Sequence, residues 1–237
     1  MNKIANASPT AKKRPKVLSQ AAAVDAIRQA IVTGQLIPGQ RLVEDDVSQL
    51  LGAISRNTVR AALTVLVHEG LVLRIDNKGA RVRTVAPEEG VQITEMRSLV
   101  EGHCAARAAE RITDDEIVEL QQLAKQMKRH VKQGNTVGFI ETKELVVDTY
   151  VRIASHPIAK EILGRLRDRN AAFRSNLAYR PGRPQVSLPY WLKTIEAICN
   201  RDPNAAQMAV HIHMENVIQI MKSMDGDKHQ FGIRAPA

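Results

Sequence analysis

The sequence predicts a mainly α-helical protein with two domains, the first of which also carries a small β-hairpin. With 237 residues, the chain is long enough for two hydrophobic cores. Only 3% of the residues are aromatic, so most of the core must consist of Leu, Val, Ile and Ala, which favours helices. Apolar residues recur at offsets of three and four along most of the chain, and two short runs after Gly70 alternate as strands do.

The most regular helix of the first domain lies in "ISRNTVRAALTVLVHEGLV", residues 54–72. One face of this stretch is apolar, Ser55 can cap the first turn, and Gly70 ends the helix. Arg56 and Arg60 are four residues apart and therefore share another face. A polar, arginine-bearing start is typical of a helix that enters the DNA major groove, although a solvated helix with two surface arginines has the same pattern.

The elements around this helix predict a winged helix-turn-helix over residues 17–86. A helix begins near Ser19 and ends before a turn at Pro38-Gly39, and "VEDDVSQLLGA" forms a second, short helix. After the third helix, "LVLRI" and "ARVRTVA" flank the sequence Asp76-Asn77-Lys78-Gly79, which suits a tight hairpin.

The distribution of charge indicates that the first domain binds nucleic acid. The whole chain has a formal net charge of +9. Residues 1–86 contain 13 Lys and Arg against 6 Asp and Glu, whereas the remainder contains 21 against 19. The basic excess thus lies in the domain with the recognition helix, as expected if that domain meets phosphates. Residues 1–16 form a disordered basic arm, which either follows DNA phosphates or only solvates the terminus.

The second domain, residues 87–226, is predicted to be an all-helical bundle of six or seven helices. Its helical segments cover 91–111, 113–133, 136–154, 157–176, 186–199 and 203–224, and "YRPGRPQVSLP" is the one clear loop. Residues 227–237 form a tail.

Other classes of protein find little support. No apolar run approaches the roughly 18 residues that span a bilayer, and no signal peptide opens the chain, so a membrane protein is not expected. Cys104 and Cys199 lack metal-type spacing, which favours a reducing cytoplasm. No nucleophile–base pair, phosphate loop or metal triad can be assembled, so an enzyme is not expected.

The residues quoted above resemble a known family. "AIRQAIVTGQLIPGQRLVEDDV", "SRNTVRAAL", "EGLV" and "NKGARV" resemble the DNA-binding domain of GntR-family bacterial transcription regulators, and "MRSLVEGHCAARAAERIT" with "AICNRDPNAAQMAVHIHM" resembles the FCD effector domain of the FadR subfamily. The resemblance implies a homodimer on a palindromic double-stranded operator, most often as a repressor. It also implies a small effector, often an organic acid, in the helical domain. The alternative is an architectural DNA-binding protein without an effector.

Carried over residue by residue, the resemblance implies DNA contacts at six positions of this chain. Arginine suits a guanine edge, whereas Asn and Thr serve a base or a phosphate, and either arginine could be the one that reads a base. Two departures matter: the turn "LLGAISR" is one residue longer than usual, and Asp45 stands where several relatives carry a DNA-contacting arginine. The six implied contacts are Arg56, Asn57, Thr58, Arg60, Lys78 and Gly79.

Many FCD domains hold a divalent metal through an Asp, a His four residues later and two further histidines. In this chain those positions fall on Lys143, Val147, Trp191 and His213, of which only His213 is a metal-ligand type. A shift by one residue brings in Glu144 and Asp148, but Trp191 still cannot bind a metal. The usual ligand set is therefore not intact, and the sequence predicts no metal cofactor.

The same positions suggest direct capture of a carboxylate effector. Arg97 and Lys143 would supply positive charge, Trp191 an apolar or stacking wall, and His213 a polar group. The alternative is purely structural: Trp191 fills the core, Lys143 points to solvent, and Arg97 pairs with Glu101, four residues further on.

Overall fold

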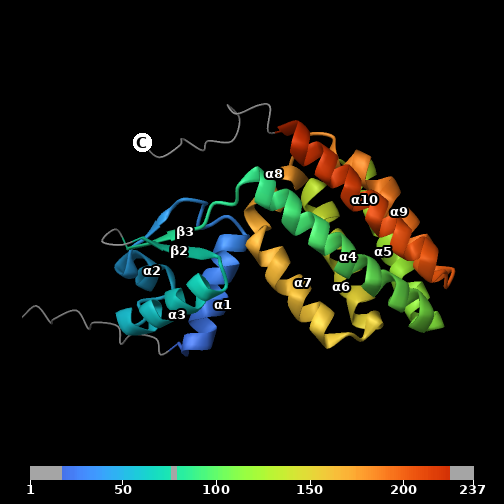
Figure 1. Cartoon of the computed structure of the whole chain (residues 1–237). Coiled ribbons are helices and arrows are strands. Elements are labelled where there is room, and N and C mark those ends of the chain that lie inside the picture. The colour runs from blue at the N-terminus through green and yellow to red at the C-terminus, as the bar shows by residue number, and fades with distance from the viewer. Residues whose placement is uncertain (1–17, 76–78, 225–237) are drawn as a thin grey trace, which may run out of the picture. The chain divides into compact units, whose positions relative to one another are not determined.

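The computed structural model describes residues 18–75 and 79–224. Within it the chain divides into two compact units after Arg83. The first unit contains three helices and a small sheet, and the second is helical throughout (Figure 1). This arrangement confirms the predicted fold class of a winged helix-turn-helix followed by a helical bundle.

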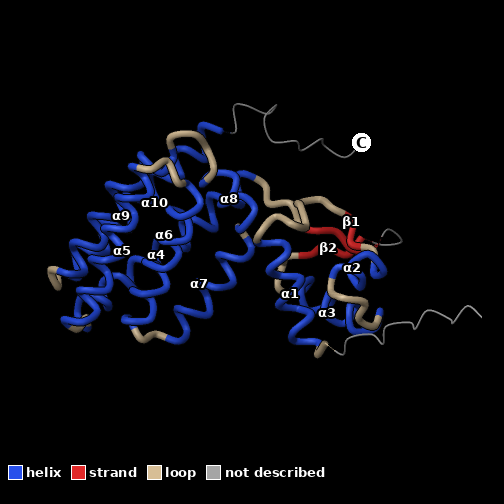
Figure 2. The backbone as a smooth tube through the Cα atoms, turned by 180° about the vertical axis from the view of Figure 1, so that it is seen from behind, coloured by secondary structure: helices blue, strands red, loops and turns tan. Residues whose placement is uncertain are grey.

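The first unit packs its helices against a three-stranded antiparallel sheet in the order β1-β3-β2 (Figure 2). Val72 of one hairpin strand pairs with Val82 of the other, and Arg41 pairs with Arg81. The two-residue strand before the second helix was not predicted, because two residues are too few to show an alternating pattern. The elements are α1 (Gln20–Val32), β1 (Arg41–Leu42), α2 (Glu44–Leu50), α3 (Arg56–His68), β2 (Val72–Ile75) and β3 (Gly79–Val82).

Helix α3 begins and packs as its sequence predicts. The Ser55 side chain accepts a hydrogen bond of 3.1 Å from the Thr58 backbone N–H, as an N-cap does. Val59 and Leu66 on the apolar face are fully buried in the core of this unit. The long turn before the helix is accommodated by left-handed backbone at Gly52 and Ala53, with φ of 86° and 64°.

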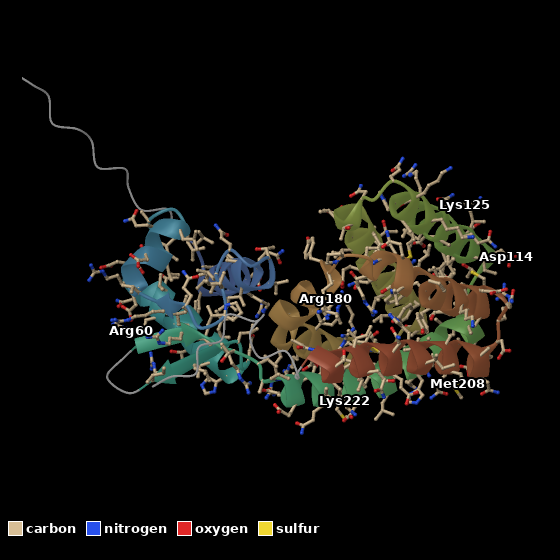
Figure 3. All side chains as sticks on the ribbon, turned by 90° about the horizontal axis from the view of Figure 1, so that it is seen from above. Arg60, Asp114, Lys125, Arg180, Met208 and Lys222 are labelled. Carbon is tan, nitrogen blue, oxygen red and sulfur yellow. The ribbon has the colours of Figure 1, made fainter. Side chains whose placement is uncertain are left out.

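The second unit is a bundle of the seven helices α4 to α10 in the described part of the chain, so the upper of the two predicted numbers is correct. Helices α4 and α10 lie side by side (Figures 1 and 3), and Gly102 allows their close approach, because a Cβ there would lie 3.3 Å from Cγ of Gln207. No described helix is both long and apolar enough to cross a bilayer. The bounds are α4 (Pro87–Arg111), α5 (Asp114–Lys132), α6 (Thr136–Ala154), α7 (Pro157–Arg169), α8 (Ala171–Ala178), α9 (Arg183–Cys199) and α10 (Pro203–Met224).

Three predicted boundaries were wrong. The first bundle helix begins at Pro87 rather than Val91, because proline is favoured in the first turn, where its missing N–H has no helical partner. The predicted single helix over 157–176 is two helices that meet at Asn170. No Gly or Pro marks this break, so it is not visible in the sequence.

The third error concerns the predicted loop Tyr179–Pro189, most of which is helical because α9 begins at Arg183. Pro184 lies in the first turn of the helix, where it costs little. Pro189 lies inside the helix and removes one backbone hydrogen bond. Burial of Trp191 and Ile198 on the inner face of the same helix offsets that loss.

Candidate functional site

The first candidate site is the exposed N-terminal end of α3. The side chains of Arg56 and Arg60 are 69% and 57% exposed, and Asn57 is exposed between them. Thr58 is half-buried, and its hydroxyl forms a hydrogen bond of 2.7 Å with the hydroxyl of Ser55. Figure 3 shows Arg60 at the edge of this unit. Four of the six predicted DNA contacts thus lie together on one accessible surface.

Both arginines of this surface form ion pairs with the first turn of α2. Arg60 makes a bidentate pair with Glu44, with both N–O distances 2.8 Å. Arg56 Nη2 donates to Asp45 at 2.7 Å. The hydrogen bond from Arg60 lowers the pKa of Glu44, so this carboxylate is ionised at neutral pH. The family resemblance implies a cation at position 45. In this chain the residue is Asp45, and its carboxylate neutralises Arg56 instead.

The hairpin adds further basic groups beside these pairs. Gly79 is exposed and has φ of +81°, a conformation that favours glycine at the start of β3. The predicted contact Lys78 lies outside the described residues. A depression of about 300 Å³ runs between the hairpin and the starts of α2 and α3, and Arg41, Arg56 and Arg74 are among its lining residues.

The second candidate site is a cavity inside the helical unit with a volume of about 70 Å³. All four predicted effector-binding residues line it, and they come from four different helices: Arg97, Lys143, Trp191 and His213. Arg174 of α8 and Arg183 of α9 also line this cavity. Among the described residues, its lining therefore includes four cationic side chains and no Asp or Glu.

Arg97 belongs to the cavity wall and also forms the predicted ion pair within its helix. Its Nη2 donates to Oε1 of Glu101 at 2.6 Å, and both side chains are buried. The other carboxylate oxygen of Glu101 accepts a hydrogen bond of 3.1 Å from Tyr150. The binding and structural interpretations of Arg97 are thus compatible, because the same side chain lines the cavity and pairs with Glu101.

A half-buried carboxylate pairs with two of the cavity's cations. Glu144 pairs with Lys143 at 2.9 Å and with Arg174 at 2.5 Å, and it also accepts a hydrogen bond from Arg167. The Lys143 side chain is only 16% exposed, so it does not point to solvent as the structural interpretation supposed. Burial, together with Arg174 and Arg97, lowers the pKa of Lys143 to about 8. Despite burial, the three cations keep the pKa of Glu144 far below its usual range.

Arg183 is buried at the first residue of α9 and has no carboxylate partner among the described residues. The only hydrogen bond of its side chain to a described residue is a 3.2 Å contact from Nη1 to Oδ1 of Asn216. Burial lowers its pKa. Because the N-terminus of a helix carries partial positive charge, a cation at this position is also unfavourable for the helix itself.

Aromatic rings form another part of the wall. The imidazole of His213 stacks on Tyr190 at 5.6 Å and meets the edge of Trp191 at 4.6 Å between ring centroids. Burial and the nearby Arg183, Lys143 and Arg97 lower the pKa of His213 to about 3, so it is neutral at physiological pH. The indole Nε1 of Trp191 is buried and has no hydrogen-bond partner among the residues that the structure describes.

The sequence analysis missed Arg174 and Arg183 as lining residues. Arg174 is one of several arginines between 165 and 180, and nothing in its neighbours distinguishes it. Arg183 fell in the segment that was expected to be a loop. A cation in the first turn of a helix is unfavourable. Arg183 would therefore have stood out as a candidate functional residue if the start of α9 had been predicted correctly.

The donor set of this site does not fit the metal that the family resemblance implies. Lys143, Val147 and Trp191 offer no ligand, and the carboxylates of Glu144 and Asp148 are occupied by arginines. In residues 18–75 and 79–224, no group of three His, Cys, Asp or Glu is placed to hold a metal ion.

Comparison with known proteins assigns both units. Residues 19–82 match the family described as bacterial regulatory proteins, gntR family, and residues 92–216 match the FCD domain. The repressor RspR of Escherichia coli is 23% identical over 198 residues, covering 84% of this chain and 86% of that protein. The Uxu operon transcriptional regulator of Escherichia coli is 26% identical over 224 residues, covering 81% and 82%.

Solved structures show the same fold. Escherichia coli McbR/YncC superposes with a TM-score of 0.76 at 21% identity, over 89% of this chain and all of that one. A GntR protein from Rhodococcus sp. RHA1 has a TM-score of 0.69 at 20% identity, over 86% and 97%. With a winged helix-turn-helix and an FCD bundle both matched, the chain belongs to the GntR family of DNA-binding transcription regulators and is not an enzyme.

Proposed function

We propose that this protein is a cytoplasmic repressor that binds a palindromic operator as a homodimer and responds to a small carboxylate in its FCD domain. The observation that carries the effector part is the cavity, because its described lining contains four cationic side chains and no acidic one. Arginine and lysine are the side chains that pair with carboxylates. The name of the similar protein RspR supports a repressor.

The proposed sensor works without a metal. The side chains at the usual metal positions supply charge and aromatic surface instead of ligands, and Arg97 and Lys143 take over the capture of the carboxylate. The FCD domain as a class binds small effectors, and the specific residues Arg97, Lys143, Trp191 and His213 are our assignment for this chain.

Exposed apolar side chains on neighbouring helices support the homodimer. Met96 and Leu99 of α4 are 51% and 61% exposed, and Met208 and Ile212 of α10 are 56% and 48% exposed. Such a face is unfavourable in water unless a partner covers it. Light scattering on the purified protein is expected to give twice the chain mass of 26.2 kDa, and a monomer would contradict the proposal.

A combined binding experiment tests the function as a whole. An operator selected from random DNA is titrated with protein in the presence and absence of a panel of organic acids, and the same acids are screened for thermal stabilisation. An effector must change operator affinity and raise the melting temperature, since a ligand that binds only the folded state stabilises it. DNA binding without any responding acid would favour the architectural alternative.

A further inference from the structure

The FCD cavity contains more positive charge than its own carboxylates neutralise. The cluster consists of the four lining cations, the neighbouring Arg167, and the carboxylates that pair with any of them. Glu101 neutralises one positive charge, Glu144 a second and Asp148 a third. His213 adds no charge when it is neutral. The five cations are Arg97, Lys143, Arg167, Arg174 and Arg183, so the described groups of this cluster carry a net excess of two positive charges.

This excess is unfavourable in the protein alone. Taking a cation out of water costs several kcal/mol in real proteins unless a counter-ion compensates it. Arg183 is the clearest case, because it is only 8% exposed and the one hydrogen bond of its side chain to a described residue goes to a neutral amide. Burial accordingly lowers the pKa of Lys143, Arg174 and Arg183 together. A group retained at such a cost is a candidate for function rather than for stability.

We infer that the effector is a small dianion, a dicarboxylate or a phosphate, that neutralises this two-charge excess and pairs with Arg183. The inference rests on the proposed function and specifies the chemical class of its ligand. The unpaired indole N–H of buried Trp191 offers a further donor to an anionic oxygen. The cavity of about 70 Å³ is small, which favours phosphate and the shortest dicarboxylates within this class.

Matched pairs of acids test the charge of the ligand. The full-length protein is titrated at constant ionic strength with malonate, succinate and glutarate, with the monocarboxylates of the same carbon number, propionate, butyrate and pentanoate, and with inorganic phosphate. At least one dianion is expected to raise the melting temperature and bind at least tenfold more tightly than its singly charged match. Tight binding of a dicarboxylate or of inorganic phosphate then shows which of the two dianions is the ligand.

The variant Arg183→Met tests the residue that the inference selects. Methionine keeps much of the volume but removes the unpaired charge, so the melting temperature without ligand is expected to rise. The dianion should then bind no more tightly than its singly charged match. The control Arg165→Met removes an exposed arginine that is paired with Glu161 on the same unit, and neither quantity should change.

Several outcomes would overturn the inference, and they separate it from the proposed function. Equal stabilisation by mono- and dicarboxylates, with a change in operator affinity, would refute the dianion while leaving the carboxylate sensor intact. A lower melting temperature of Arg183→Met with an unchanged dianion response would show that Arg183 only packs the start of α9. If no acid or phosphate binds, both the inference and the proposed effector class are wrong.

Discussion

Arg56 and Arg60 are paired with Asp45 and Glu44, so the predicted operator contacts require each arginine to exchange its carboxylate for DNA. Arg56→Ala or Arg60→Ala is expected to weaken operator binding by roughly 1–3 kcal/mol if the arginine reads a base, and to relax specificity at that base. An arginine that contacts phosphate would instead weaken all sequences alike. Anisotropy titrations with operator and scrambled DNA distinguish the two, and full affinity in both variants would refute the docking of α3.

The pair between Asp45 and Arg56 is expected to compete with the predicted DNA contact of Arg56. Asp45→Asn removes a negative charge from this surface and releases the arginine, so DNA affinity should rise by up to about fivefold, because an exposed ion pair contributes roughly 0–1 kcal/mol. Asp25→Asn is the matched control, since Asp25 is an exposed partner of Arg28 on α1. A loss of affinity in Asp45→Asn would instead mean that the carboxylate positions Arg56 or accepts a hydrogen bond from a base.

The proposed role of Lys143 predicts that effector binding depends on pH. Its pKa of about 8 lies below the ordinary value of 10.5, so in the folded protein Lys143 loses its charge as the pH rises through about 8. An anion favours the protonated lysine; affinity should therefore be constant below pH 7 and fall by up to about tenfold per pH unit above pH 8. Glu144, Arg97 and Arg174 face the same ammonium group and set this range. Calorimetric titrations from pH 6 to 9.5 should show this fall, and Lys143→Met should lack it.

At the scale of single elements, local sequence decides where most helices begin. In α5, the Thr113 hydroxyl accepts from the Glu116 N–H at 3.3 Å, and the Glu116 carboxylate accepts from the Thr113 N–H at 3.0 Å. Thr113→Ala should destabilise the helical unit by about 1 kcal/mol. Thermal unfolding measures this, and exposed Lys125→Ala in the middle of the same helix (Figure 3) should have almost no effect. Equal destabilisation by Thr113→Ala and Lys125→Ala would show that the Thr113 cap does not stabilise the helical unit.

Elements with such local signals were predictable, and those without them were not. Ser55 and Thr113 mark the starts of α3 and α5 as N-caps, and both helices begin where the sequence indicates. The break at Asn170 has no such signal. Its side chain is fully buried with neither amide atom hydrogen-bonded, so tertiary packing rather than local preference places the junction of α7 and α8. Pro184 and Pro189 led to the prediction of a loop where α9 begins, although only Pro189 is unfavourable in a helix.

At the scale of the whole molecule, regulation requires that the two domains share a free energy of coupling. If an effector lowers operator affinity by some factor, the operator must lower effector affinity by the same factor. To test this, the effector is titrated calorimetrically into free protein and into the protein–operator complex. We expect the ratio of these two effector dissociation constants to equal the ratio of the operator dissociation constants measured with and without effector. A mismatch would show that the acid acts on DNA or on oligomerisation instead.

The sequence by itself determined the division into a basic winged helix-turn-helix and a helical bundle, because hydrophobic period, caps and turn residues act over a few residues each. It also indicated Arg97, Lys143, Trp191 and His213, and these four side chains line one cavity. Only the tertiary structure brought in Arg174 and Arg183, and only it paired the arginines of α3 with the acids of α2. The physical reason is charge balance, because a cation is neutralised only by carboxylates that the fold brings within a few ångströms of it. The spacing of residues along the chain does not determine these distances.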